Sequence, residues 1–339
     1  MINDIGIDLG TSSVLVYVKG KGVVIDEPAV VVVDKNTNKV ISVGKEAARM
    51  LGRTPAGLVA MRPMRDGVIN HYDMTLQMIK YFIKKAIGNT FFKPRVIVCV
   101  PSGITEVEER AVCEATIRAG AKKVHLIEEP VAAALGAGLD ISKPVGNMVI
   151  DIGAGTTDIA VMSLSDVVSS ESIKVAGNKL DEAIVKYIRR KHSMLIGDTT
   201  AEELKIKIGT AWPFSEVQSC EVKGRCLIEG LPKKVTINTK ELIEAMDEPL
   251  TQIVDAVCRV IEMTPPELVG DIATGGIVLT GGGSKLRGID KLIEKATGIK
   301  THIPENPTTC VCVGTGRSLE NISLLPEGIL NISRSKLTK

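Results

Sequence analysis

The stretch DIGIDLGTSS, residues 4–13, has a counterpart in VIDIGAGTTD, residues 149–158. Each begins as an apolar strand, continues as Asp-apolar-Gly, and ends in small polar residues. A second apolar run follows in both places, from Val14 to Val18 and from Ile159 to Met162. Each stretch therefore predicts a β-hairpin with a turn of glycine and threonine. The interval between the two is too long for a solenoid repeat, so the pair indicates a duplicated domain.

Length and composition place the chain among globular proteins. Its 339 residues suggest about two domains, and 44% hydrophobic with 24% charged residues excludes wholesale disorder. The 42 basic and 40 acidic residues leave a net charge of +2, which argues against a dedicated nucleic-acid binder. Aromatic residues make up only 3%, too few for a platform that stacks on single-stranded nucleic acid. We therefore expect no nucleic-acid partner.

The cysteines and the N-terminus predict a cytoplasmic protein. Seven cysteines, an odd number, occur without a Cys-x-x-Cys pair, so we expect reduced thiols in the core. Asp4 and Asp8 stand where a signal peptide would be apolar. No run approaches the ~18 apolar residues of a membrane span.

Predicted strands and helices alternate along the rest of the chain, which indicates an α/β fold with mixed sheets. Apolar runs predict strands, and apolar periodicity, capping boxes or proline in a first turn predict helices. The expected strands are Ala29 to Val33, Val96 to Val100 and Ile277 to Thr280, and the expected helices are Met74 to Ile87, one opening at Thr105-Glu106-Val107-Glu108 and ending at Gly120, one opening at Thr200-Ala201-Glu202-Glu203, and one opening at Thr264-Pro265-Pro266-Glu267.

The two hairpin turns carry residue types that hold a phosphate chain. Glycine lets backbone N–H groups approach a phosphate, and the neighbouring hydroxyls donate further hydrogen bonds. Asp8 and Asp151 end the two strands, where a carboxylate suits Mg²⁺, expected through water because the ion keeps most of its hydration shell. One such loop alone is more often an ordinary glycine turn. The matched pair, with a third glycine loop at 281–283, instead predicts a nucleotide in a cleft between duplicated halves.

Glu129 is a further candidate for the chemistry. It follows an apolar run from Val124 to Ile127, and Pro130 disfavours helix for it, so its carboxylate is expected at a strand end. There it would orient or deprotonate a water that attacks a γ-phosphate. The alternative is that Glu128 and Glu129 form a solvated pair that caps a helix beginning near Val131.

The sequence resembles the actin, sugar-kinase and heat-shock-chaperone superfamily, and within it most closely the MreB family of bacterial actin homologues. The motifs that carry the resemblance run in family order over nearly the whole chain. They are Asp8-Leu9-Gly10-Thr11, Gly52-Arg53-Thr54-Pro55, residues 62–69 (RPMRDGVI), residues 100–105 (VPSGIT), Glu128-Glu129-Pro130, residues 151–158, residues 264–268 (TPPEL) and residues 279–283 (LTGGG).

The resemblance implies a duplicated, ribonuclease-H-like, two-lobed ATPase fold with four subdomains and a central nucleotide cleft. Lobe I would span residues 1–140, with a small insert at about 33–69. Lobe II would span residues 141–311, with an insert at about 182–244 and an adenosine loop at 280–284. The tail from about 312 to 339 would return to lobe I.

The resemblance also implies ATP and Mg²⁺ as cofactors and assigns residues to them. Asp8 and Asp151 would hold Mg²⁺ through water, and Glu129 would position the attacking water with help from Thr156. Ala154 stands in the usual run of three glycines, so its methyl group would modestly alter nucleotide geometry or turnover. The nucleotide-binding residues would be Gly10, Thr11, Ser12, Ser13, Gly153, Ala154, Gly155, Thr156, Thr157, Asp158, Gly177, Glu202, Lys205, Gly281, Gly282 and Gly283. Glu202 and Lys205 also have a simpler interpretation, an exposed ion pair on one helix face.

Phe91 and Phe92 lie in an expected loop between a helix and a strand. One interpretation is that a ring anchors the loop on the core. The other is membrane insertion, because paired rings bury large apolar area while Lys93 and Arg95 attract anionic headgroups. MreB proteins bind membranes through such a loop or an N-terminal amphipathic helix. Residues 1–3 are too short for that helix, which favours the loop.

The resemblance implies an ATPase that polymerises into filaments of paired strands on the inner face of the cytoplasmic membrane. With the cell-wall elongation machinery as partner, such filaments would guide wall synthesis and maintain cell shape. Filament growth requires a head-to-tail contact that does not close into a ring. A small-molecule, sugar-type kinase of the same superfamily is the main alternative, although no separate sugar-binding carboxylate stands out. A chaperone ATPase would need a substrate domain after Lys339.

Overall fold

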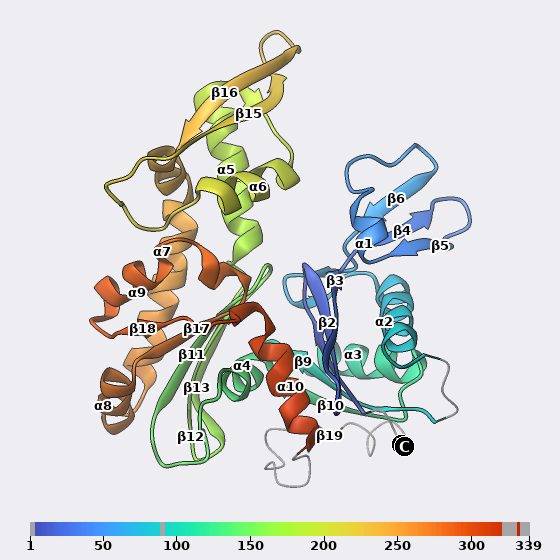
Figure 1. Cartoon of the computed structure of the whole chain (residues 1–339), viewed down its shortest axis with the longest axis vertical. Coiled ribbons are helices and arrows are strands. Elements are labelled where there is room, and N and C mark those ends of the chain that lie inside the picture. The colour runs from blue at the N-terminus through green and yellow to red at the C-terminus, as the bar shows by residue number, and fades with distance from the viewer. Residues whose placement is uncertain (1–3, 89–91, 321–330, 333–339) are drawn as a thin grey trace.

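The computed structural model describes residues 4–88, 92–320 and the backbone of 331–332. Its elements form two halves, each built on a β-sheet and each carrying a smaller group of strands and helices at one end (Figure 1). The duplication predicted from the two hairpin stretches is confirmed, because each hairpin stands at the same place in its own sheet. In both halves the first hairpin strand also pairs in parallel with a later strand.

The first half is organised by a six-stranded sheet in the order β19-β10-β9-β1-β2-β3. In the hairpin of β1 and β2, Asp8 lies opposite Leu15, and β1 runs parallel to β9. Helices α2 (Tyr72–Ile87) and α3 (Glu106–Arg118) pack beside this sheet (Figure 1). The strands are β1 (Ile5–Leu9), β2 (Ser13–Val18), β3 (Gly22–Pro28), β9 (Arg95–Val100), β10 (Lys123–Glu128) and β19 (Asn331–Ile332).

A small subdomain is inserted between β3 and α2. It holds a three-stranded sheet in the order β5-β4-β6 and a short hairpin of β7 and β8. The elements are β4 (Val31–Asp34), β5 (Val40–Val43), α1 (Lys45–Ala48), β6 (Leu58–Met61), β7 (Met64–Arg65) and β8 (Val68–Ile69).

The second half repeats the plan with a five-stranded sheet in the order β13-β12-β11-β17-β18 and a three-stranded sheet, β14-β15-β16, in its insert. The sheet strands are β11 (Asn147–Ile152), β12 (Thr157–Ser163), β13 (Asp166–Ile173), β17 (Ile277–Thr280) and β18 (Thr301–His302). The helices beside them are α7 (Thr239–Met263), α8 (Pro266–Gly275) and α9 (Ile289–Thr297). The insert comprises α5 (Gly177–His192), β14 (Met194–Leu195), α6 (Asp198–Ile208), β15 (Ser219–Cys226) and β16 (Pro232–Asn238).

Two helices, α4 (Glu129–Ala137) and α10 (Cys310–Glu320), lie between the two sheets (Figure 1). They approach so closely that a Cβ on Gly136 would collide with the backbone of Cys310, and one on Gly314 with that of Ala132. α10 also packs against β1 and β2. Glycine at these two positions therefore permits the close backbone packing that joins the halves.

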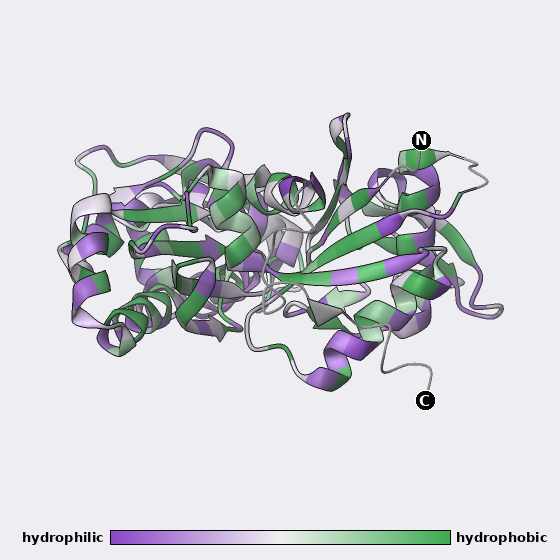
Figure 2. Cartoon of the chain, turned by 90° about the horizontal axis from the view of Figure 1, so that it is seen from below, coloured by the Kyte–Doolittle hydropathy of each residue, from purple (hydrophilic) through white to green (hydrophobic). Residues whose placement is uncertain are grey.

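The predicted elements are largely confirmed, and burial explains why. Along α2 the buried side chains include Met78, Ile79, Phe82 and Ile83, which is the face that the apolar spacing predicts. Figure 2 shows mainly hydrophobic strands in the sheets and mixed hydropathy along the helices. The capping box at Thr105 is present, with Glu108 as its partner.

Two helix starts differ from expectation. The capping box predicted at Thr200 is wrong, because α6 already begins at Asp198 after Gly197, which places Thr200 inside the first turn. The helix expected to begin near Val131 begins at Glu129, because proline is tolerated in a first turn. None of the helices within the described residues is long and apolar enough to cross a bilayer.

Candidate functional site

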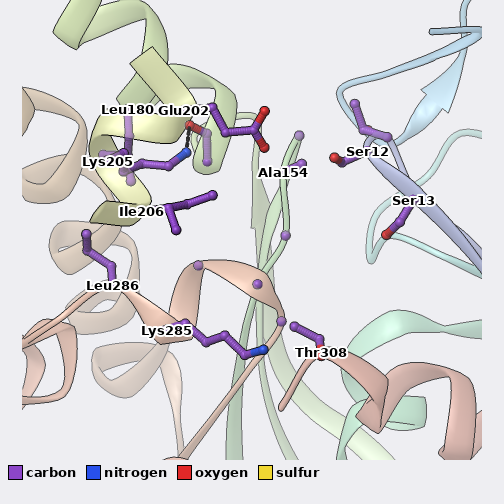
Figure 3. Close-up of a pocket in the computed structure, with 18 of the residues that line it drawn as sticks. Ser12, Ser13, Ala154, Leu180, Glu202, Lys205, Ile206, Lys285, Leu286 and Thr308 are labelled. Atoms are coloured by element: carbon purple, nitrogen blue, oxygen red, sulfur yellow. Dashed lines mark hydrogen bonds between the residues drawn. The ribbon is translucent and has the colours of Figure 1, made fainter. Parts of the chain in front are cut away.

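A cavity of about 850 Å³ opens between the two halves, and most of the predicted site residues line it. Figure 3 shows Ser12 and Ser13 on one side, Glu202, Lys205 and Ile206 on another, and Ala154 between them. The lining residues predicted from sequence are Asp8, Gly10, Thr11, Ser12, Ser13, Glu129, Asp151, Gly153, Ala154, Gly155, Thr156, Gly177, Glu202, Lys205, Gly281, Gly282 and Gly283. Thr157 and Asp158 are fully buried behind the turn and are not part of this lining.

The two hairpin turns meet at the floor of the cavity. A Cβ on Gly155 would lie 2.5 Å from Oγ1 of Thr11 in the other hairpin, so this approach requires glycine. The amide N–H of Gly153 donates to the carbonyl oxygen of Thr156 at 2.9 Å, which closes the second turn. Glycine and other small residues of both turns thus surround one end of the cavity, which lets their backbone come close to a bound phosphate.

A loop from the small insert completes this end. The amide N–H of Gly67 donates to Oγ1 of Thr11 at 3.0 Å, and the guanidinium of Arg62 donates to the carbonyl oxygen of Ser12 at 2.9 Å. Gly67 has a φ of 76°, and a Cβ there would lie 2.9 Å from Cγ2 of Thr156. The sequence offered no local chemistry that marked Gly67, which lines the cavity only because the chain folds back between the hairpins.

Carboxylates gather beneath the turns, where Asp151 is buried and Asp8 and Glu129 are partly buried at the wall of the cavity. Burial, with the nearby Asp151 as the next cause, raises the pKa of Asp8 to about 7. Burial raises the pKa of Asp151 to about 6, although its hydrogen bond from Oγ1 of Thr280, 2.6 Å long, opposes the shift. The pKa of Glu129 is raised well above its usual value by burial and then by the charges of Asp158, Asp151 and Asp8. This end of the site is therefore short of positive charge.

That shortage fits a hydrated Mg²⁺ held between Asp8 and Asp151. Within the described ranges, no group of three or more His, Cys, Asp or Glu side chains is placed to hold a metal ion directly. The donor set therefore suits an ion that takes most of its ligands from water and phosphate oxygens, as Mg²⁺ does.

The opposite end of the cavity is built by helices α5 and α6 and the glycine loop after β17. Nζ of Lys205 donates to the carbonyl oxygen of Gly177 at 2.9 Å and lies 2.8 Å from Oδ1 of Asp181. The ion-pair partner of Lys205 is therefore Asp181, and the exposed pair with Glu202 is not what the structure contains. Leu180, Ile206 and Leu286 add apolar surface suited to a flat base.

Sequence reasoning missed Lys285, Leu286 and Arg287, which also line this end. The guanidinium of Arg287 lies over the ring of Phe214, 4.4 Å from its centroid, and 3.7 Å from a carboxylate oxygen of Glu216. Only their position directly after the Gly281–Gly283 loop could have signalled them.

The predicted membrane loop is described only in part. Phe91 lies outside the described residues, whereas the side chain of Phe92 is 63% exposed. Arg95 does not match the role expected for it, because its guanidinium is bound by the buried carboxylate of Asp4, with Nε 3.1 Å from Oδ1. The Asp4 carboxylate therefore neutralises the charge of the Arg95 guanidinium at the start of β9.

Two lobes with duplicated mixed sheets around a central cleft define an actin-like fold. The crystal structure of MreB 5 of Spiroplasma citri bound to AMPPNP matches with a TM-score of 0.91 and 38% identity, covering 95% of this chain and 97% of that one. The MamK double helical filament has the same fold, with a TM-score of 0.79 and 22% identity over 94% of this chain and 99% of that one.

Sequence comparison gives the family. The MreB/Mbl protein family matches residues 2–327. The cell shape-determining protein Mbl of Bacillus cereus is 52% identical over 328 residues, covering 96% of this chain and 98% of that protein. The cell shape-determining protein MreB of Escherichia coli K12 is 50% identical over 328 residues, covering 95% and 94%. The chain belongs to the MreB/Mbl family.

Proposed function

We propose that the protein binds and hydrolyses ATP and polymerises into filaments that lie on the cytoplasmic membrane, guide cell-wall synthesis and maintain cell shape. The observation that carries this proposal is the cavity between the halves, where two Asp-Gly hairpins and a third glycine loop converge. Curated relatives at about half identity are named cell shape-determining proteins. Structures of MreB 5 from Spiroplasma citri are bound to AMPPNP and to ADP.

The residues around the cavity divide the work of binding. Backbone N–H groups of residues 10–13 and 154–156 would bind the phosphates, and Gly177, Glu202, Lys205 and Gly281–Gly283 would enclose the adenosine. Mg²⁺, when bound, would neutralise charge on the phosphate chain. Asp8 and Asp151 would orient its water ligands, and a cation there would offset the cost of removing two carboxylates from water.

Glu129 would orient the water that attacks the γ-phosphate, with help from Thr156 of the second hairpin, which lines the same cavity. Phosphoryl transfer depends mostly on the positioning of the reacting groups and on electrostatics, so a carboxylate held in a fixed place is sufficient to orient the water. Burial raises the pKa of Glu129, which also makes its carboxylate a stronger proton acceptor. The proton of the attacking water would pass to this carboxylate.

Assembly and location extend the same proposal. The halves would close on ATP and favour a head-to-tail contact between copies, which grows into a filament. Phe92, with Phe91, would insert into the inner face of the cytoplasmic membrane, and the cell-wall elongation machinery would be the protein partner. Membership in the MreB/Mbl family supports these assignments.

Calorimetry combined with phosphate release tests the core of the proposal. We expect the wild-type protein to bind Mg·ATP and release phosphate without any added acceptor. Asp8→Ala and Asp151→Ala should each weaken Mg·ATP binding by about 10- to 100-fold, as loss of an outer-shell partner does. Unchanged affinity in both variants would contradict the assigned site. A sugar-type kinase would instead consume ATP only after a small-molecule acceptor is added.

A further inference from the structure

Asp158 has a place that the nucleotide site does not explain. It lies on β12 directly opposite Asp151, it is fully buried, and it is not part of the cavity lining. Burial raises its pKa to about 7, so retaining a carboxylate here is costly. Its Oδ2 atom is buried and has no hydrogen-bond partner among the described residues. Such a group calls for a function of its own.

The other oxygen of Asp158 reaches across the interface between the halves. Oδ1 accepts a hydrogen bond from the backbone N–H of Ser102 at 2.8 Å. Ser102 belongs to the first half, in the loop between β9 and α3, and is itself buried. A charged acceptor on a backbone N–H in a dry environment makes a strong and directional contact.

Ser102 then connects to the chemistry. Its Oγ donates to Oε2 of Glu128 at 2.7 Å, and Glu128 directly precedes Glu129 at the junction of β10 and α4. Asp158 is also the charge with the largest effect on Glu129. A continuous path therefore runs from the second hairpin through Asp158, Ser102 and Glu128 to Glu129.

We propose that Asp158 is a positioning residue, which holds Ser102 across the interface and thereby fixes Glu129 relative to the second hairpin. The inference rests on the proposed ATPase and deepens it. Through this path, the hairpin that would hold the phosphates and the carboxylate that would orient the water move as one unit. Asp158 itself is not part of the cavity lining, so we assign it a role through Ser102 rather than a direct contact with the reacting groups.

Steady-state turnover and ATP affinity test this role together. Asp158→Ala removes the acceptor, so kcat should fall by about 10- to 100-fold, as small misplacements of reacting groups do, while the Kd for ATP stays within about 3-fold. Asp158→Asn keeps an acceptor for Ser102 but removes the charge near Glu129, so its loss of kcat should be several-fold smaller than that of Asp158→Ala. Loss of kcat in both variants alike would overturn positioning through the hydrogen bond, because charge rather than the acceptor would then matter.

Ser102→Ala, alone and combined with Asp158→Ala, tests whether the effect of Asp158 passes through Ser102. Ser102→Ala removes the link to Glu128, so kcat should fall, and adding Asp158→Ala should cost little more because both act through one chain of contacts. If the loss of kcat in the double variant equals the product of the two single losses, Asp158 and Ser102 act independently and the shared path is overturned. Thr116→Val, a change of a buried hydroxyl bonded within α3, controls for general destabilisation and should leave kcat unchanged.

Hydrogen exchange of the Ser102 backbone amide in the nucleotide-free protein measures its hydrogen bond to Asp158 without any assay of ATP hydrolysis. Exchange should be at least about 10-fold faster in Asp158→Ala and close to wild type in Asp158→Asn. Equal protection of the Ser102 amide in wild type, Asp158→Ala and Asp158→Asn would overturn the proposed contact between Asp158 and Ser102. Wild-type protein that releases no phosphate would overturn the ATPase and this role with it, whereas normal wild-type turnover with an unaffected Asp158→Ala would overturn the positioning role alone.

Discussion

Nζ of Lys205 lies 2.8 Å from Oδ1 of Asp181, and Nζ of Lys179 lies 2.8 Å from Oε2 of Glu182. The two ion pairs have the same length but differ in burial. The Lys205 and Asp181 side chains are 14% and 9% exposed, against 40% and 41% for Lys179 and Glu182. Because water screens the second pair, only the first is expected to matter for stability.

Lys205→Ala should therefore lower the free energy of unfolding by about 3 kcal/mol, since it leaves a buried carboxylate unpaired. Lys179→Ala is the matched control and should cost less than about 1 kcal/mol. Burial raises the pKa of Asp181 to about 6, so protonation relieves the unpaired charge below that pH. The loss in Lys205→Ala should be larger at pH 8 than at pH 5. Urea unfolding at both pH values measures it, and equal costs for the two lysines would contradict the burial argument.

The buried carboxylates of the cleft predict how stability depends on pH. Asp8 has its pKa raised from 3.8 to about 7, so between these values the folded protein binds more protons than the unfolded chain. The free energy of unfolding contributed by Asp8 should then fall as pH rises from about 4 to 7. Asp151, raised to about 6, acts in the same direction.

Asp8→Asn removes one of these titrations. Relative to wild type, this variant should be more stable at pH 8 than it is at pH 5, in unfolding experiments on nucleotide-free protein. A difference that does not change between the two pH values would mean that Asp8 is not desolvated in the nucleotide-free state.

Glu129→Ala should separate binding from turnover. The variant should retain Mg·ATP, because glycine turns and hydroxyls bind the phosphates. Hydrolysis should slow on the order of 10²-fold, as loss of one general-base contribution does. Single-turnover phosphate release measures the effect. A rate equal to wild type would reduce Glu129 to the first residue of α4 with no part in catalysis.

Phe91→Ser with Phe92→Ser should abolish binding to anionic liposomes and leave the fold intact. Two inserting rings contribute roughly 3–6 kcal/mol, and a filament repeats this anchor along its length. Arg95 is bound to Asp4, so Lys93 rather than Arg95 should add the electrostatic attraction. Co-sedimentation and a melting curve measure both properties.

Ile228→Ser provides the control for the phenylalanine pair. Ile228 is 82% exposed in the connection between β15 and β16, and its substitution should leave lipid binding unchanged. A large fall in the melting temperature of the phenylalanine variant would instead show that the rings belong to the core, where truncation costs about 3–5 kcal/mol each.

Local patterns predicted the hairpins and most helices correctly, because their turn and capping chemistry lies within a few residues. The hairpin over residues 149–162 follows from its glycine turn, and α3 follows from the capping box of Thr105 and Glu108. The N-cap predicted at Thr200 was wrong because the same residue types also suit the inside of a first helical turn. The N-cap residue of α6 is Gly197, which makes no side-chain cap.

Partners distant in sequence could not be predicted. Spacing placed Lys205 beside Glu202, but its partner Asp181 comes from another helix. The resemblance implied that Asp158 binds the nucleotide, while its burial and its bond to Ser102 depend on how the two halves meet. Asp66-Gly67 is typical of a tight turn, but the place of Gly67 at the cavity arises only where a loop of the insert passes between both hairpins.

ATP bound in the cleft should drive assembly of the protein on a membrane. Electron microscopy of the purified protein on an anionic lipid monolayer, with and without Mg·ATP, tests it most directly. We predict filaments on the lipid with Mg·ATP and dispersed particles without nucleotide. Dispersed particles in both samples, with ATP binding verified by calorimetry, would contradict the account.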